Sequence, residues 1–126
     1  MDVNIPGIDV ETGIKNSGSL EFLIEILGDV YHLMDEKVDL VESYLSQGNI
    51  KDYTVMVHSL KTTCRMIGAV ELGEDFYALE KLGKEENIPQ INARTPDVLK
   101  AFMALKPYLA PYAEQGTDSS DDFLLG

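Results

Sequence analysis

The sequence predicts an all-α protein: an antiparallel up-down four-helix bundle with a short extra helix at its N-terminal end. Three observations lead to this fold class. Apolar residues recur at spacings of three and four along most of the chain, residues that favour helix ends separate these runs, and no segment alternates convincingly with a period of two. Four amphipathic helices with short connections bury their apolar faces in such a bundle. A chain of 126 residues suits one domain, which we place at residues 1–113.

The first two predicted helices have clear ends. A short helix is expected from Asp9 to Lys15, ended by the polar and glycine residues at 16–18. Ser19 is a good N-cap for a second helix, which continues as one long helix to the break at 47–49. Its apolar stripe consists of Leu20, Leu23, Leu27, Val30, Met34, Val38, Val41 and Leu45.

Two further helices follow without a long connection. Asn49 can cap the first of them, which ends at Gly68. The next helix frays toward the residues at 86–87. The stripe of the first is Tyr53, Met56, Val57, Leu60, Cys64 and Ile67, and that of the second is Leu72, Phe76, Leu79 and Leu82.

The last helix is expected to begin at Thr95-Pro96-Asp97, where an N-cap residue, a proline and an acid follow one another. Residues 88–94 are ambiguous and could add a turn. Pro107 is expected to kink or shorten the helix. Residues 114–126 are polar and acidic, and we expect a disordered tail there.

Charge and composition exclude several classes of protein. A net charge of -12 argues against nucleic-acid binding and against docking on an anionic membrane, and it is compatible with a protein partner. No apolar run is long enough to span a membrane, and the first residues do not resemble a signal peptide. A single cysteine, Cys64, fits a reducing compartment. We therefore expect a cytoplasmic protein, and two histidines and one cysteine on separate faces predict no metal site.

His58 lies on the polar side of its predicted helix. At about 100° per residue, it lies roughly 150° from the centre of the apolar stripe, so it is expected to face solvent or the bundle edge. Lys61, Thr62 and Arg65 follow at i+3, i+4 and i+7 and share its surface. The other histidine, His32, is expected to be an ordinary surface residue.

This arrangement suits phosphoryl transfer. A neutral imidazole is nucleophilic near pH 7, and nearby cations disfavour its protonation. Lys61 and Arg65 could stabilise the negative charge that develops on the transferred oxygens. An exposed histidine with a lysine three residues later is also common on ordinary solvated faces, so the pattern by itself leaves both interpretations open.

The run His58-Ser59-Leu60-Lys61, followed by a helical stretch that closes on Gly68-Ala69, resembles the signature of histidine-containing phosphotransfer (HPt) domains. The similarity extends on both sides. Residues 8–14 resemble the family's short N-terminal helix, residues 48–49 the turn before the histidine helix, and residues 72–80 the next helix. In all, the resemblance covers about residues 8–110.

The resemblance implies a phosphorelay intermediate of two-component signalling. Its histidine would accept a phosphoryl group from the aspartyl phosphate of a receiver domain and pass it to another response regulator. It implies no ATP-dependent kinase activity, no cofactor, Mg²⁺ only on the partner receiver domain, and a monomer that is either free or a module of a hybrid sensor kinase. Within it, His58 matches the phosphoacceptor, Lys61 the assisting cation, and Gly68 the glycine that ends the helix or permits close packing.

Two residues near the predicted site depart from the family pattern. Thr62 stands where many members have glycine, and its methyl and hydroxyl groups could alter docking or bond the phosphoryl group. Glu80 stands where some members have a glutamine that faces the histidine; a carboxylate could orient the imidazole but would repel phosphate. Arg65 is not a fixed family feature, so its role depends on helical spacing alone.

Two rival interpretations remain. The dimerisation domain of a histidine kinase also exposes a histidine on a helical hairpin, but it usually carries an acid directly afterwards, where this chain has Ser59. The other rival is a non-catalytic helical adaptor in which His58 has no chemistry. The chain contains no glycine-rich P-loop motif, so it is not expected to make phosphohistidine from ATP.

Overall fold

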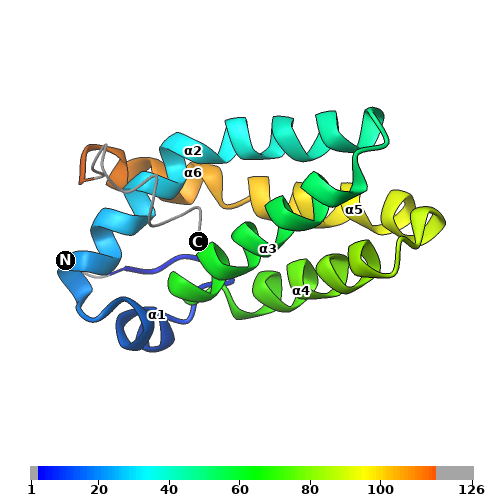
Figure 1. The fold of residues 1–126 in the computed structure, drawn as a ribbon. Helices are drawn as coiled ribbons and strands as arrows, with labels where there is room; N and C mark the ends of the chain where they lie inside the picture. The colour runs from blue at the N-terminus through cyan, green and yellow to red at the C-terminus, as the bar shows by residue number, and fades with distance from the viewer. Residues whose placement is uncertain (1–2, 116–126) are drawn as a thin grey trace.

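The computed structural model describes residues 3–115, and every regular element in that range is helical. Figure 1 shows four long helices, α2 to α5, lying side by side with their long axes roughly aligned, while the short α1 packs at one end against α2 and α3. The all-helical class predicted from the sequence is confirmed. In chain order the elements are α1 (Val10–Ser17), α2 (Leu20–Ser46), α3 (Ile50–Met66), α4 (Val70–Lys84), α5 (Ile88–Met103), α6 (Lys106–Leu109) and the 3-10 helix η1 (Ala110–Gln115).

Each of the first three helices begins with a side-chain cap: Ser19 and Asn49 are the caps predicted from the sequence, and the first helix begins at Val10, one residue after the predicted Asp9. The side chains of Asp9, Ser19 and Asn49 each accept a hydrogen bond from the backbone N–H three residues further on, at 3.2, 3.0 and 3.1 Å. These bonds satisfy backbone donors that have no partner inside the helix. The first helix runs to Ser17, two residues beyond the predicted Lys15, and Gly18 ends it with a left-handed φ of 107°.

The predicted start of the last long helix at Thr95 is wrong, because α5 begins seven residues earlier at Ile88. Residues 88–94, which the sequence left ambiguous, form its first turns. Asn87 caps them by accepting from the backbone N–H of Gln90 at 3.3 Å. The chain thus contains two local start signals, and the earlier one prevails because it buries Ile91 completely.

Thr95 and Pro96 consequently lie inside a helix. Pro96 has no backbone N–H and crowds the preceding turn, which costs about 3 kcal/mol in a helix interior. The Thr95 side chain is turned into the core, where its hydroxyl and that of Tyr53 hydrogen-bond at 2.6 Å. Burial raises the pKa of the Tyr53 phenol, and the Thr95 bond only partly offsets this effect.

Pro107 shortens the last helix as predicted. The helix α5 ends at Met103, and a separate four-residue helix, α6, begins at Lys106 with Pro107 near its N-terminus. The described chain continues in η1 through Gln115, two residues past the predicted domain boundary at 113. The rest of the predicted acidic tail, residues 116–126, lies outside the described residues.

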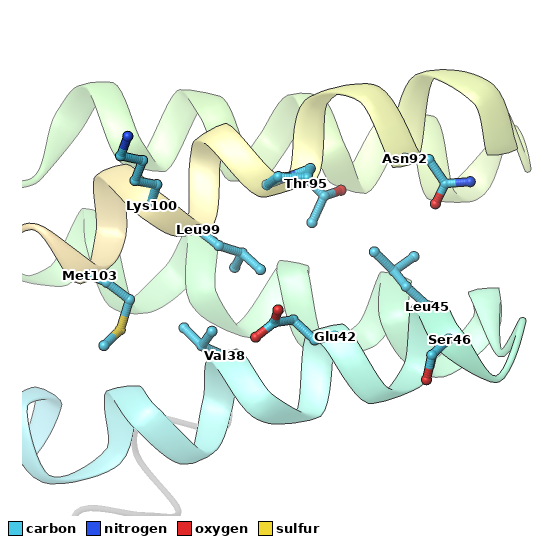
Figure 2. A pocket seen from close by; sticks show the side chains of 10 residues that line it. Val38, Glu42, Leu45, Ser46, Asn92, Thr95, Leu99, Lys100 and Met103 are labelled. Carbon is cyan, nitrogen blue, oxygen red and sulfur yellow. The ribbon is translucent and has the colours of Figure 1, made fainter.

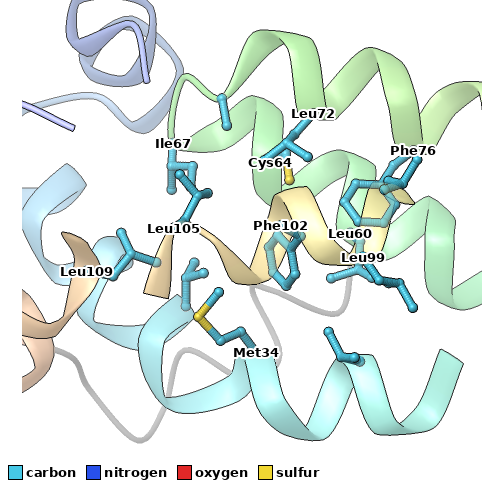
Figure 3. Close-up of a cluster of buried hydrophobic side chains, with 14 of the residues drawn as sticks. Met34, Leu60, Cys64, Ile67, Leu72, Phe76, Leu99, Phe102, Leu105 and Leu109 are labelled. Carbon is cyan, nitrogen blue, oxygen red and sulfur yellow. The ribbon is translucent and has the colours of Figure 1, made fainter. Parts of the chain in front are cut away.

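A single apolar core joins the helices (Figure 3). Four side chains, one from each long helix, meet in this core and are at most 1% exposed: Met34 of α2, Leu60 of α3, Phe76 of α4 and Phe102 of α5. The Phe76 and Phe102 rings pack edge to face with their centroids 5.7 Å apart, a favoured aromatic geometry. Cys64 is buried in the same core, as predicted, and burial raises the pKa of its thiol.

The longest helix, α2, has 27 residues and an amphipathic pattern. Its inner face is buried in the core, and its outer face exposes Asp35, Glu36, Asp39 and Glu42. None of the helices between residues 3 and 115 is both long and apolar enough to cross a membrane.

Two glycines in α4 allow it to lie close to α3. A Cβ at Gly83 would come within 2.1 Å of the Thr54 hydroxyl, and a Cβ at Gly73 would come within 3.0 Å of the Arg65 side chain. Each glycine weakens the helix by roughly 1 kcal/mol relative to alanine, so close packing is the compensating gain. This close approach places Glu80 of α4 next to His58 of α3.

Candidate functional site

His58 lies in the middle of α3 with a side chain that is 45% exposed. Its sequence neighbours Val57 and Ser59 are buried, so the ring projects from the helix at the edge of the bundle, beside α4. The predicted position of His58, away from the apolar stripe, is confirmed.

A buried carboxylate holds the ring. Glu80 is only 4% exposed, and its Oε2 lies 2.9 Å from Nδ1 of His58. The same carboxylate accepts a hydrogen bond from Lys61 Nζ at 2.7 Å through Oε1, and Lys84 Nζ lies 3.3 Å from Oε2. Three donors from α3 and α4 therefore converge on one carboxylate.

These donors keep Glu80 ionised. Burial by itself disfavours the charged form, but the hydrogen bonds from Lys61, His58 and Lys84 outweigh it and lower the pKa of Glu80 from 4.5 to about 2. A carboxylate that stays charged near pH 7 accepts hydrogen bonds and cannot donate one.

The geometry also determines the tautomer of His58. Because the Glu80 carboxylate only accepts, Nδ1 of His58 must carry the proton that it donates. In the neutral ring the other nitrogen, Nε2, then holds the lone pair. Since nearly half of the side chain is exposed, the arrangement leaves a nucleophilic nitrogen on the side of the ring away from Glu80.

Of the predicted neighbours, Lys61 and Thr62 lie at His58. The Lys61 side chain is only 12% exposed and is held by Glu80, so its charge lies beside the imidazole. Thr62 donates its hydroxyl to the backbone oxygen of His58 at 3.2 Å, one turn earlier in the same helix. The hydroxyl is therefore engaged within α3 in this structure.

The structure does not bring Arg65 and Gly68 to the histidine. The Arg65 guanidinium lies 3.4 Å from Glu74, and its stem lies against Gly73. Gly68 is ten residues from His58, about 15 Å along the helix direction. It ends α3 with a φ of 82° and packs so closely on α1 that a Cβ would lie 2.1 Å from the Asp9 backbone oxygen.

Three residues of α4 near the site were not predicted from the sequence: Lys84, Tyr77 and Lys81. Lys84 is four residues after Glu80, and Tyr77 is three residues before it, so helical spacing would have placed both beside Glu80. The Tyr77 ring has Lys81 Nζ 4.6 Å from its centroid.

The described chain also has a groove away from His58. A groove of about 560 Å³ between α2 and α5 is lined by apolar side chains, among them Val38, Leu45, Leu99 and Met103 (Figure 2). Its lining includes neither His58 nor any residue that contacts it. His58 therefore lies outside this groove, with a side chain that is 45% exposed.

The other histidine, His32, is exposed, as predicted. Its Nε2 lies 2.7 Å from the backbone oxygen of Ala113. Between residues 3 and 115, no group of three or more His, Cys, Asp or Glu side chains is placed to hold a metal ion.

Comparison of the chain with protein-family models, with curated proteins and with solved structures found no match.

Proposed function

We propose that this chain is a phosphocarrier of the HPt type. His58 accepts a phosphoryl group from the aspartyl phosphate of a receiver domain and passes it to another response regulator in a two-component phosphorelay. The observation that carries the proposal is the buried Glu80 carboxylate, which binds Nδ1 of His58 at 2.9 Å and leaves Nε2 as the nucleophile of a side chain that is 45% exposed.

The transfer balances without an added reactant. The Nε2 lone pair attacks phosphorus, the N–P bond forms, and the P–O bond to the receiver aspartate breaks, so that aspartate leaves as a carboxylate. The ring becomes a phosphoimidazolium whose proton remains on Nδ1. Glu80 stabilises this positive charge because it already accepts the Nδ1 hydrogen bond. In the onward step, the carboxylate of the acceptor attacks phosphorus and the electron pair returns to Nε2.

The two lysines on Glu80 offset the repulsion that a carboxylate by itself would exert on phosphate. Lys61 and Lys84 lie 2.7 and 3.3 Å from the Glu80 oxygens, so the three side chains together carry a net charge of about +1. This balance supports roles for Lys61 and Lys84 in offsetting the negative charge of the incoming phosphoryl group. Arg65 would contribute only after leaving Glu74.

The proposal includes the finer assignments of fold, partner and location. The helices α2 to α5 form the antiparallel up-down four-helix bundle of residues 1–113, with α1 as the extra N-terminal helix. The chain acts as a cytoplasmic monomer, either free or as a module of a hybrid sensor kinase. Its partners are receiver domains, which bring the Mg²⁺, and it has no ATP-dependent kinase activity of its own.

One observation favours the second candidate, a non-catalytic helical adaptor. The groove between α2 and α5 is apolar, open to solvent and remote from His58, which are features of a site for a partner's side chains. In the adaptor, replacing His58 changes neither partner binding nor output.

The two histidines of the chain provide a matched test. The wild type, His58→Gln and His32→Gln are each mixed with phosphorylated receiver domains, and transferred label is followed on gels. The phosphocarrier predicts label on the wild type and on His32→Gln but none on His58→Gln. A label on phosphohistidine is lost in acid and survives base.

Each result assigns the function. Label that persists on His58→Gln would exclude His58 as the carrier. No label on the wild type from any member of a receiver panel, with the helical fold verified by circular dichroism, would favour the adaptor.

A further inference from the structure

Tyr77 lies at the centre of a cluster of cations beside the site. It is 38% exposed on α4, and its ring centroid is 5.4 Å from Lys61 Nζ, 5.5 Å from Arg65 Cζ and 4.6 Å from Lys81 Nζ. Cations within about 6 Å of an aromatic ring are attracted to its face. We call these four residues the tyrosine patch.

The tyrosine patch continues directly from His58. Lys61 belongs to both, because it donates to the Glu80 carboxylate that also holds the imidazole. Along α3, Arg65 at the far end of the tyrosine patch is about 10 Å from His58. The Tyr77 ring centroid is 5.4 Å from Lys61 Nζ, so we expect a domain that reaches Nε2 of His58 to cover Tyr77 as well.

The charge of the tyrosine patch is opposite to that of the chain. The chain has 22 acidic and 10 basic residues. Three of the ten basic residues, Lys61, Arg65 and Lys81, belong to the tyrosine patch, and a fourth, Lys84, adjoins it at Glu80. Together with the paired carboxylates Glu80 and Glu74, these four cations have a net charge of about +2. Most of an acidic protein repels an acidic partner, whereas the tyrosine patch with Lys84 attracts one.

We propose that the tyrosine patch is the docking surface for an acidic face of the phosphorylated receiver domain, with the Tyr77 ring buried at its centre. This inference depends on the proposed function. Partner carboxylates meet Lys81 and compete with Glu74 for Arg65, whose pair at 3.4 Å is exposed on both sides and is therefore weak. Tyrosine is frequent at the centre of protein interfaces because it combines a large apolar ring with a polar end.

The test separates docking from chemistry. Transfer rates are measured against the concentration of a receiver that labels the wild type, for Lys81→Glu, Tyr77→Ala and the control Lys100→Glu. Lys100 is exposed on α5 and lines the distant groove. Reversing its charge therefore changes the net charge of the chain by the same amount as Lys81→Glu does. We expect KM to rise about fivefold for Lys81→Glu and about tenfold for Tyr77→Ala, with kcat within about twofold of the wild type and no change for Lys100→Glu.

Two further measurements, one at raised salt concentration and one with a small phosphoryl donor, complete the experiment. Added salt should raise KM of the wild type more than KM of Lys81→Glu, because screening removes an attraction that the variant lacks. Phosphoramidate, a phosphoryl donor that needs no docking surface, should label the wild type and both patch variants equally.

The outcomes distinguish the two proposals. A KM that is the same in the wild type, Lys81→Glu and Tyr77→Ala overturns the docking inference and leaves the phosphocarrier intact. Equal rises of KM in Lys81→Glu and Lys100→Glu overturn it as well, because net charge would then explain the effect. A wild type that no receiver and no phosphoramidate labels at His58 overturns the phosphocarrier together with the inference.

Discussion

Replacing Glu80 with glutamine should destabilise the protein by about 2 kcal/mol. Of the three donors on this carboxylate, Lys84 and His58 have side chains that are 67% and 45% exposed, so water can take the place of Glu80. Lys61 is only 12% exposed, and its charge-assisted bond of 2.7 Å is worth about 1.5–3 kcal/mol. The amide oxygen of glutamine accepts more weakly, and the expected loss stays below the roughly 3–5 kcal/mol of a fully buried pair.

Urea unfolding followed by circular dichroism at pH 7 measures this loss, and thermal unfolding should show a Tm lower by about 8 °C. Glu74→Gln on the same helix is the matched control. Its pair with Arg65 is 3.4 Å long and exposed on both sides, so it should change stability by less than about 0.5 kcal/mol. If Glu80→Gln cost no more than Glu74→Gln, the reasoning that a buried carboxylate orders this site would be refuted.

Three further predictions concern stability, each measured by urea unfolding. Because the pKa of Glu80 is lowered from 4.5 to about 2, its ionised form contributes stability that is fully present above pH 4.5. The free energy of unfolding should therefore differ less between the wild type and Glu80→Gln as the pH falls from 5 to 2. A difference that stays constant would contradict the lowered pKa of Glu80. Gly68→Ala adds left-handed strain and a Cβ 2.1 Å from the backbone oxygen of Asp9, the residue that caps α1, so it should cost about 3 kcal/mol or more. Gly18→Ala, with a left-handed φ but open space, should cost only about 1–2 kcal/mol, and equal costs would show that close packing is unimportant. Thr95→Val leaves the buried Tyr53 hydroxyl without its bond at 2.6 Å and should cost about 1–3 kcal/mol, whereas no loss would mean that this bond adds no net stability.

The starts of the first three helices were predictable to within one residue because the signal is local. Asp9, Ser19 and Asn49 each bond a backbone N–H only three residues away, so sequence neighbours contain the whole interaction. The start of α5 was mispredicted because two local signals competed. Burial of Ile91 and the bond from Thr95 to Tyr53, 42 residues apart, decided between them.

The candidate site likewise has features that were predictable from local sequence and features that depend on contacts between helices. The outward position of His58 follows from helical periodicity, and the structure agrees. The direction of the Arg65 side chain does not follow from helical periodicity, because its guanidinium could turn toward any of the helices beside α3. It lies by Glu74 and Tyr77, since Gly73 leaves room for its stem against α4.

The sequence by itself determined the all-helical class, the starts of the first three helices to within one residue, and the exposed face of His58. These features depend on groups within about four residues of one another, as helical hydrogen bonds and caps do. Only the tertiary structure decided that Glu80 holds both Nδ1 of His58 and Lys61. Those bonds join residues 22 and 19 positions apart on two helices, and they form because Gly73 and Gly83 let α3 and α4 pack closely enough for these side chains to meet.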